Sequence, residues 1–254
     1  MTLLWLGVLA QVLADFVLQT DRLAKMKSEI KLRAFVEHGL ALFLCTFALT
    51  HFYGLKPALG FSSAAALVHV LIDCLKSFFA KRFAGQNSAI TGFILDQLAH
   101  LYTLFLLWFL FANVFTVKPN ETILALYSTV FPGIDLPGLL NSHLEKIVVA
   151  SVVSVYVLFG GAVLNRILLD GLLNALRNSA LPAIGKWIGI LERAIILIFV
   201  ACNEITAVAF VLTAKSIARF KQLDDRNFAE YYLVGTLTST IIAILGGLVL
   251  RACL

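Results

Sequence analysis

Long apolar runs constrain this chain more than any other feature of its sequence. Hydrophobic residues make up 60% of the 254 residues and only 14% are charged. Several runs lack the polar face that every element of a soluble domain needs. The runs cover residues 2–18, 34–53, 59–80, 90–117, 147–163, 188–214 and 231–250. A helix of about 20 apolar residues spans a bilayer, because it satisfies its backbone polar groups internally. We therefore predict an all-α, polytopic transmembrane bundle of about six or seven helices.

The runs divide the chain into two membrane halves. Residues 1–117 hold four runs and the His and Asp motifs, residues 118–146 form a connection with several prolines and glycines, and residues 147–254 form the second half. Basic residues gather in the turns at 21–33 and 76–89. The positive-inside bias places these turns in the cytoplasm, and the amino terminus and residues 118–146 outside. The predicted location is the cell membrane, with multiple passes.

The second half contains polar residues within apolar surroundings. One polar stripe at helical spacing predicts an amphipathic helix in the interface plane; it consists of Arg166, Asp170, Asn174 and Arg177. The topology of residues 186–230 stays open. If the sixth run crosses once, the basic segment from Lys215 to Arg226 lies outside, against the bias. Alternatively, the run enters and returns around Asn203 and Glu204. The sequence assigns no role to Glu192, Glu204, Lys215, Arg219 or Glu230.

The first half contains an internal repeat. Gln11-Val-Leu-Ala-Asp15 matches His69-Val-Leu-Ile-Asp73 at an offset of 58 residues, and the same offset carries His38 onto Asp96. Membrane proteins often build central sites between such repeats. We interpret the first four helices as a duplicated helical hairpin that places polar side chains at one depth.

The polar positions have the spacing of metal ligands on facing helices. His69 and Asp73 are four residues apart, as are Asp96 and His100, and residues at this spacing share one helix face. Mixed His and carboxylate ligands are typical of metal sites in bundles and suit Zn, Mn or Fe. The predicted ligands of a divalent metal near the cytoplasmic face are His69, Asp73, Asp96 and His100. Asp15 and His38 are predicted to be catalytic acid or base groups, or further ligands.

Three functions fit these residues. A bound metal would activate water to hydrolyse an amphiphilic or lipid-linked substrate. A transporter or channel would use the same residues as a proton or cation relay. In a non-catalytic scaffold or accessory subunit they would only pair with one another, because an unpaired ionisable group in a membrane costs about 2.5–3.5 kcal/mol. The lipid bilayer is the expected partner. The net charge of +5 does not indicate nucleic acid, since the basic residues lie beside apolar runs.

One segment and two motifs carry a family resemblance. Leu13-Ala-Asp15-Phe16-Val-Leu-Gln19-Thr20-Asp21, with His69-x-x-x-Asp73 and Asp96-Gln97-x-x-His100, resembles the domain-of-unknown-function 3307 family of bacterial integral membrane proteins. The His-x-x-x-Asp helices are also similar to those of membrane-bound metal-dependent hydrolases, which implies a metal-dependent activity. The chain departs from the family pattern at Gln11, where the first helix usually carries His. Gln is a poor ligand for a transition metal, which argues against a site that uses every polar residue of the first hairpin.

Overall fold

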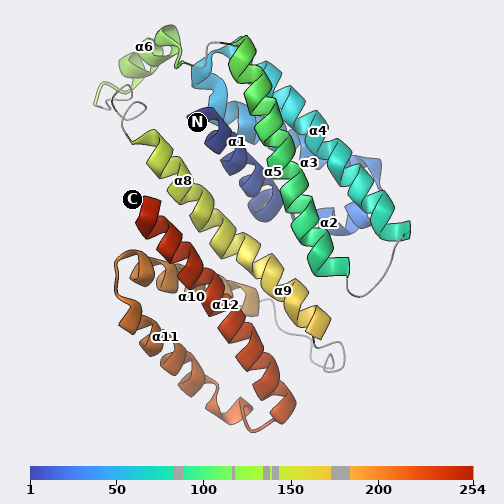
Figure 1. The fold of residues 1–254 in the computed structure, drawn as a ribbon, viewed down its shortest axis with the longest axis vertical. Coiled ribbons are helices and arrows are strands. Elements are labelled where there is room, and N and C mark those ends of the chain that lie inside the picture. Colours follow the sequence, from blue (N-terminus) through green and yellow to red (C-terminus); the bar gives the residue numbers. More distant parts are fainter. Residues whose placement is uncertain (83–87, 116–117, 134–137, 139–142, 173–183, 254) are drawn as a thin grey trace. The chain divides into compact units, whose positions relative to one another are not determined.

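The computed structural model describes residues 1–82, 88–115, 118–133, 138, 143–172 and 184–253, and every regular element within them is a helix (Figure 1). Among these residues, five helices are long and apolar enough to cross a membrane, or six if a bent pair near the amino terminus counts as one span. The predicted all-α bundle is therefore confirmed, at the lower end of its predicted helix number. The chain divides into a first unit, Met1–Gly85 with Thr91–Val152, and a second unit, Gln86–Ile90 with Val153–Leu254.

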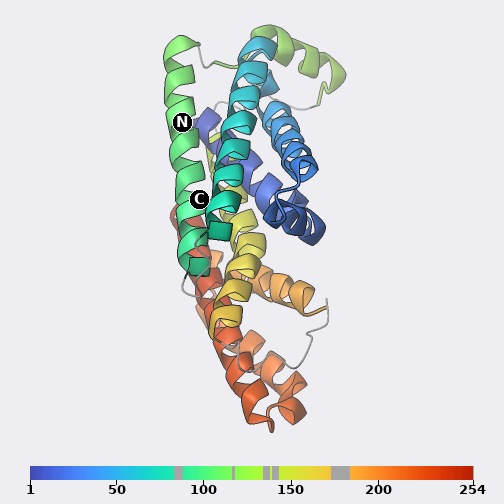
Figure 2. The same cartoon turned by 90° about the vertical axis from the view of Figure 1, so that its right-hand side faces the viewer.

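Four long helical segments build the first unit. They are α1 (Thr2–Val12) with a π-helical extension (Leu13–Leu18), α3 (Leu32–Thr50), α4 (Leu55–Arg82) and α5 (Ser88–Val114). Helices α4 and α5 run side by side in both views (Figures 1 and 2). The short helices α2 (Asp21–Ser28) and α6 (Glu121–Val130) and the start of α8 (Leu144–Val155) complete the unit.

Helix α1 forms the centre of the first unit, and its neighbours expose apolar faces. Every residue from Leu6 to Val12 is buried, as expected for a helix that is hydrophobic on all sides. On α4, by contrast, Leu67, Leu71 and Leu75 are 72%, 59% and 48% exposed and recur at every fourth position. An apolar outer stripe of this kind suits contact with lipid.

The basic segment after the first run is a helix lying across the end of the bundle. The Thr20 hydroxyl accepts a hydrogen bond from the Leu23 N–H, which caps the start of α2. Helix α2 is bent by 95° from the preceding span, and the extended backbone of Gln19 makes this bend. The sequence had indicated only a cytoplasmic turn here.

The second unit begins within a long span. Helix α8 continues through a π-helical segment (Tyr156–Gly160) into α9 (Gly161–Leu172). Arg166 and Asp170 of the predicted interfacial helix therefore lie on the continuation of this span, while Asn174 and Arg177 lie outside the described residues. The interfacial helix stays a prediction. The unit continues with α10 (Ile184–Ala201), α11 (Ile205–Ala218) and α12 (Arg226–Cys253).

Helices α10 and α11 form a hairpin that breaks the sixth apolar run. Asn203 has a positive φ of 66°, and its N–H donates to the Val200 carbonyl at 3.0 Å while the Glu204 N–H donates to the Phe199 carbonyl at 2.7 Å. These two bonds define a Schellman stop, for which Asn is the usual non-glycine choice. The Lys215 ammonium contacts the Glu192 carboxylate at 2.6 Å. This pair joins the two arms across the turn, which favours the alternative in which the run returns around Asn203 and Glu204.

The other polar residues of this region have local roles. Glu204 is exposed at the start of α11, the Arg219 guanidinium lies 6.0 Å from the Phe228 ring centre, and the Glu230 carboxylate pairs with Arg226 at 3.0 Å. In the hairpin Glu204 lies at the tip, between the two arms.

Glycines bring α12 close to α10. A Cβ atom on Gly247 would lie 2.6 Å from the Val200 Cβ and 3.2 Å from the Leu197 carbonyl oxygen.

The buried Arg193 guanidinium also ties α10 to its neighbours, donating to the Leu158 carbonyl at 2.8 Å and to the Ser239 hydroxyl at 3.0 Å. Leu158 lies in the π-helical segment, where irregular helix geometry makes a carbonyl available to an outside donor.

Candidate metal centre

Four segments of the first unit bring all six sequence-predicted site residues into one buried cluster. The π-helical segment supplies Asp15, α3 supplies His38, α4 supplies His69 and Asp73, and α5 supplies Asp96 and His100. The side chain of Asp15 is the most exposed of them, at 12%, and that of His38 is 1% exposed. The division of these residues into metal ligands and acid or base groups stays a prediction.

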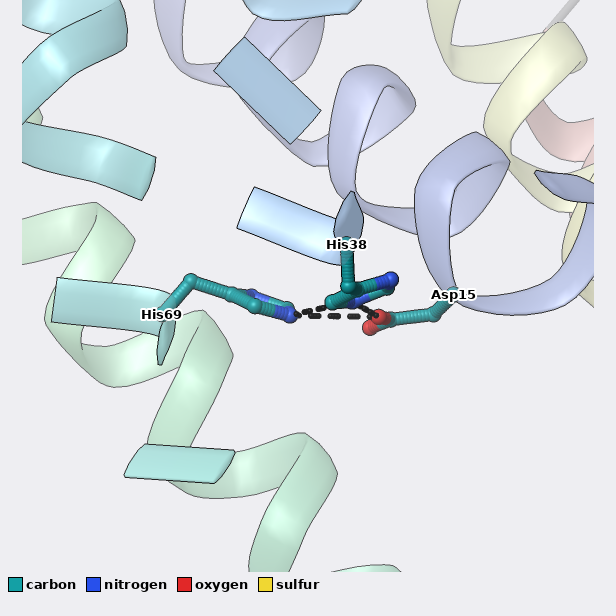
Figure 3. Close-up of side chains that lie close together, drawn as sticks. All are labelled: Asp15, His38 and His69. Carbon is teal, nitrogen blue, oxygen red and sulfur yellow. Dashed lines mark hydrogen bonds and ion pairs between the residues drawn. The ribbon is translucent and has the colours of Figure 1, made fainter. Parts of the chain in front are cut away.

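Three of the side chains point at one another (Figure 3). The His38 Nε2 lies 3.0 Å from the Asp15 Oδ1 and 2.9 Å from the His69 Nε2, and the His69 Nε2 lies 3.2 Å from the same Asp15 oxygen. Two ligands of a tetrahedral zinc with Zn–N bonds of 2.0–2.1 Å are about 3.3 Å apart. The three atoms therefore form a triangle of nearly the size that one divalent ion requires.

The chemistry of these atoms also favours a cation. A carboxylate oxygen only accepts hydrogen bonds, and each imidazole nitrogen offers either a lone pair or one N–H. If one proton is shared between two of the three atoms, the third atom faces another acceptor and has no hydrogen to bind. A cation at the centre of the triangle attracts all three lone pairs at once. In addition, the buried His38 Nδ1 has no hydrogen-bond partner in the described part of the chain, where this ring makes its polar contacts through Nε2.

The carboxylate of Asp73 extends the cluster toward α5. Its Oδ2 lies 3.6 Å from the His69 Nε2 and 3.7 Å from the His38 Nε2, whereas its Oδ1 lies 3.7 Å from the His100 Nε2. The His100 Nε2 is in turn 3.4 Å from the Asp96 Oδ1. The His69 and His100 rings stack with their centres 4.0 Å apart. One continuous set of nitrogen and oxygen ligands thus runs from α1 to α5.

Local backbone features place these side chains. Asp15 lies in a π-helical segment, a geometry found frequently at functional sites. Gly39, next to His38, allows α3 to approach α4, because a Cβ atom there would lie 2.6 Å from the Val70 Cγ2. His38 precedes Gly39 on α3 and His69 precedes Val70 on α4, so this close approach also brings the two imidazoles together.

Two lysines neutralise part of the acidic charge. The Lys27 ammonium, carried by α2, lies 2.5 Å from the Asp73 Oδ2 and 2.7 Å from the Gln19 Oε1. The Lys76 ammonium lies 2.7 Å from the Asp96 Oδ2. Within the described residues, Asp15 has ion-pair contacts only with imidazoles. With neutral imidazoles the cluster carries three negative and two positive charges, so a divalent ion would change its net charge from −1 to +1.

Sequence reasoning does not identify Lys27, Gln19 or Lys76 as part of the site. The positive-inside bias explains the basic residues of both turns as orientation signals. Lys27 is instead buried because α2 folds across the bundle. The signal was present, since Thr20 followed by Asp21 is a typical helix start. It indicates a helix in place of a turn, but not the 95° bend that aims Lys27 at Asp73.

A small cavity adjoins the cluster on the side of α1 that carries Gln11. It offers about 10 Å³ to the centre of a water molecule, and Thr46, His69, His100 and Thr103 are among its lining residues. This is about the minimum space for one ordered water. His69 is ten residues from the end of its candidate span Leu55–Phe79, or about 15 Å by helical rise. The cluster therefore extends from the predicted cytoplasmic side to mid-span.

The comparison with known families covers this part of the chain. Residues 3–125 match the model of a family described as "Protein of unknown function (DUF3307)". No curated protein and no solved structure matches the chain, so nothing supports the similarity to hydrolases beyond the motifs themselves. The matched region contains all six site residues together with Lys27 and Lys76. The match supports the resemblance of residues 3–125 to this family of unknown function.

Proposed function

We propose that the protein is a membrane-embedded metal-dependent hydrolase. Asp15, His38 and His69 hold a divalent ion, of Zn, Mn or Fe, and the substrate is amphiphilic or lipid-linked. The observation that carries this proposal is the convergence of one carboxylate oxygen and two imidazole nitrogens, 2.9–3.2 Å apart, from three separate elements.

The number of ligands favours catalysis over a structural role. Structural zinc sites have four protein ligands, whereas catalytic sites have three and leave a position open. A metal held by these three residues would supply an activated water near neutral pH. The cavity beside His69 has room for one such water. The matching set of two His and one carboxylate also occurs in iron enzymes, so the ligands alone do not choose between the metals.

The surroundings favour an amphiphilic substrate. The site extends to mid-span, and the outer faces of its helices carry exposed leucines, so a substrate dissolved in the bilayer can approach at the right depth. The buried Lys27 ammonium lies next to the ligand set. In a water-poor site it is well placed to stabilise negative charge that develops on the substrate.

Elemental mass spectrometry tests the metal. Protein purified in detergent without chelators should contain near-stoichiometric metal, and His38→Ala and Asp15→Asn should lose it. Glu37→Gln is the matched control, because Glu37 precedes His38 on α3 but is exposed and paired with Arg33. Absence of metal from wild-type protein, even after Zn, Mn and Fe are added, would contradict the proposal.

Activity assays test the second half of the proposal. Metal-loaded protein in lipid vesicles should cleave chromogenic amphiphilic esters or phosphoesters. His38→Ala should lower the rate at least about a hundredfold, as loss of an essential catalytic component does. Glu37→Gln should keep the wild-type rate.

A relay for protons or cations is the second candidate, supported by the continuity of the cluster. Lys76, Asp96, His100, Asp73 and His69 follow one another with contacts of 2.7–3.7 Å and end at the cavity. Intramembrane chains of this kind mark proton relays in transporters. Proton flux in liposomes that is lost in Asp96→Asn, in protein without bound metal, would favour this function over hydrolysis.

A further inference from the structure

Asp73 presents its two carboxylate oxygens to two different sets of ligands. Its Oδ2 faces the imidazoles of His38 and His69, and its Oδ1 faces that of His100. We propose that the centre binds two divalent cations bridged by Asp73, with the second held by Asp96, His100 and the Asp73 Oδ1. This inference rests on the proposed function, since the first cation is the one held by Asp15, His38 and His69. The bridge adds a fourth protein ligand to that cation, so the open position of the two-ion centre lies on the second cation, which has three.

The distances suit a second ion. The His100 Nε2 lies 3.4 Å from the Asp96 Oδ1 and 3.7 Å from the Asp73 Oδ1, close to the separation of about 3.3 Å expected between ligands of one tetrahedral ion. A carboxylate that uses both oxygens can bridge two ions about 3.5–4 Å apart, the spacing found in two-metal hydrolytic sites. The His100 nitrogen therefore lies near enough to an oxygen of each carboxylate to share an ion with both.

An unsatisfied oxygen is an independent sign of a missing partner. The Asp96 Oδ1 is buried and has no contact of hydrogen-bond geometry among the described residues; the His100 Nε2 lies 3.4 Å from it. Buried polar atoms without hydrogen bonds are rare in native proteins, and a bound ion is one of the usual reasons. This oxygen faces His100, so a cation that binds it would lie at the proposed second site.

Lys76 is the built-in competitor for the second ion. Its ammonium contacts the other oxygen of Asp96, while its side chain is 47% exposed. The ammonium can therefore move into water when an ion binds. Exchange of one ammonium for one divalent ion adds a single positive charge to the cluster. Lys27 is buried and tied to Gln19, so it stays in place and keeps one charge of Asp73 balanced.

Titration with Mn²⁺ alone tests this arrangement. The bound ions are counted by elemental mass spectrometry, and their coupling is followed by electron paramagnetic resonance. Wild-type protein should bind two ions per chain with an exchange-coupled signal. Asp96→Asn should bind one, with an uncoupled signal, and the retained ion shows that this variant is folded. In Lys76→Gln the second ion should bind at a Mn²⁺ concentration roughly two- to fivefold lower, because an exposed ion pair competes only modestly.

The outcomes separate the two proposals. One ion per chain in both wild type and Asp96→Asn would overturn the binuclear inference and leave the proposed function intact. No ion in wild type would overturn both. Two ions in wild type with unchanged affinity in Lys76→Gln would remove Lys76 as the competitor, and two ions in Asp96→Asn would remove Asp96 as a ligand.

Discussion

Individual residues show why charge pairing alone does not explain this cluster. Asp73 and Asp96 each have a lysine partner, as expected if ionisable groups only compensate one another in a membrane. Asp15 has no such partner within the described chain and faces two imidazoles instead. Without a metal, Asp15 is compensated only if one of the two imidazoles is protonated, so Asp15, His38 and His69 are the residues at which metal binding and simple pairing make different predictions.

The Lys27–Asp73 pair gives a prediction for metal-free protein. Lys27→Met leaves the buried Asp73 carboxylate without its cation, so in the presence of chelator it should destabilise the first unit by about 3–5 kcal/mol. Adding Asp73→Asn to Lys27→Met should recover most of this loss, because the double variant has no unpaired buried charge. Unfolding in detergent, followed for the four combinations, measures the coupling. A double variant as unstable as the sum of the two single variants would show that the two residues act independently.

At the scale of elements, the hairpin of α10 and α11 resolves the conflict over charge. In a single crossing the basic segment from Lys215 to Arg226 faces outside, against the positive-inside bias. In the hairpin, the Glu192–Lys215 contact brings the end of α11 back to the middle of α10. If the run returns in this way, both ends of the hairpin face one side of the membrane, and the positive-inside bias predicts that this side is cytoplasmic.

Labelling from the two sides of the membrane tests this topology. In a variant without native cysteines, single cysteines replace the exposed Gly185, before the hairpin, and the exposed Asp224, after it. A membrane-impermeant maleimide should reach both positions from the same side of sealed vesicles. The result is independent of the absolute orientation of the protein. Labelling from opposite sides would show that the run crosses once despite the Schellman stop at Asn203.

For the whole molecule, the sequence predicted the long helices and the positions of the site residues, because these follow from apolar length and helical periodicity. The apolar runs at 34–53, 59–80 and 90–117 correspond closely to α3, α4 and α5, because apolar length is the main requirement for a membrane helix. The 58-residue repeat and the four-residue spacings predicted that Asp15, His38, His69, Asp73, Asp96 and His100 would come together. Helical periodicity decides which face a residue occupies, so these positions could be found without a structure.

Features that depend on helix bending and on close contact could not be predicted in this way. The break at Gln19 turns α2 by 95° and buries Lys27, and local composition alone indicated a solvated turn. The close approach of α3 and α4 at Gly39 sets the 2.9 Å separation of the two imidazole nitrogens. Neither the 95° bend nor the 2.9 Å separation follows from spacing along the chain, since each depends on contacts between segments that are distant in the sequence.

The metal should stabilise the first unit selectively, because its proposed ligands join three helical segments there, and α5 contacts them through the stacked rings of His69 and His100. Both candidate ligand groups within the described residues belong to the first unit. At a free-ion concentration of about 100 times Kd, binding contributes about 2.7 kcal/mol. Chelation should therefore lower the unfolding temperature of wild-type protein by roughly 5–10 °C and should leave that of His69→Ala unchanged. Hydrogen exchange gives the location: protection should fall in α1, α3, α4 and α5 and stay constant in α10, α11 and α12. An equal loss of protection in both units would contradict a selective effect of the metal on the first unit.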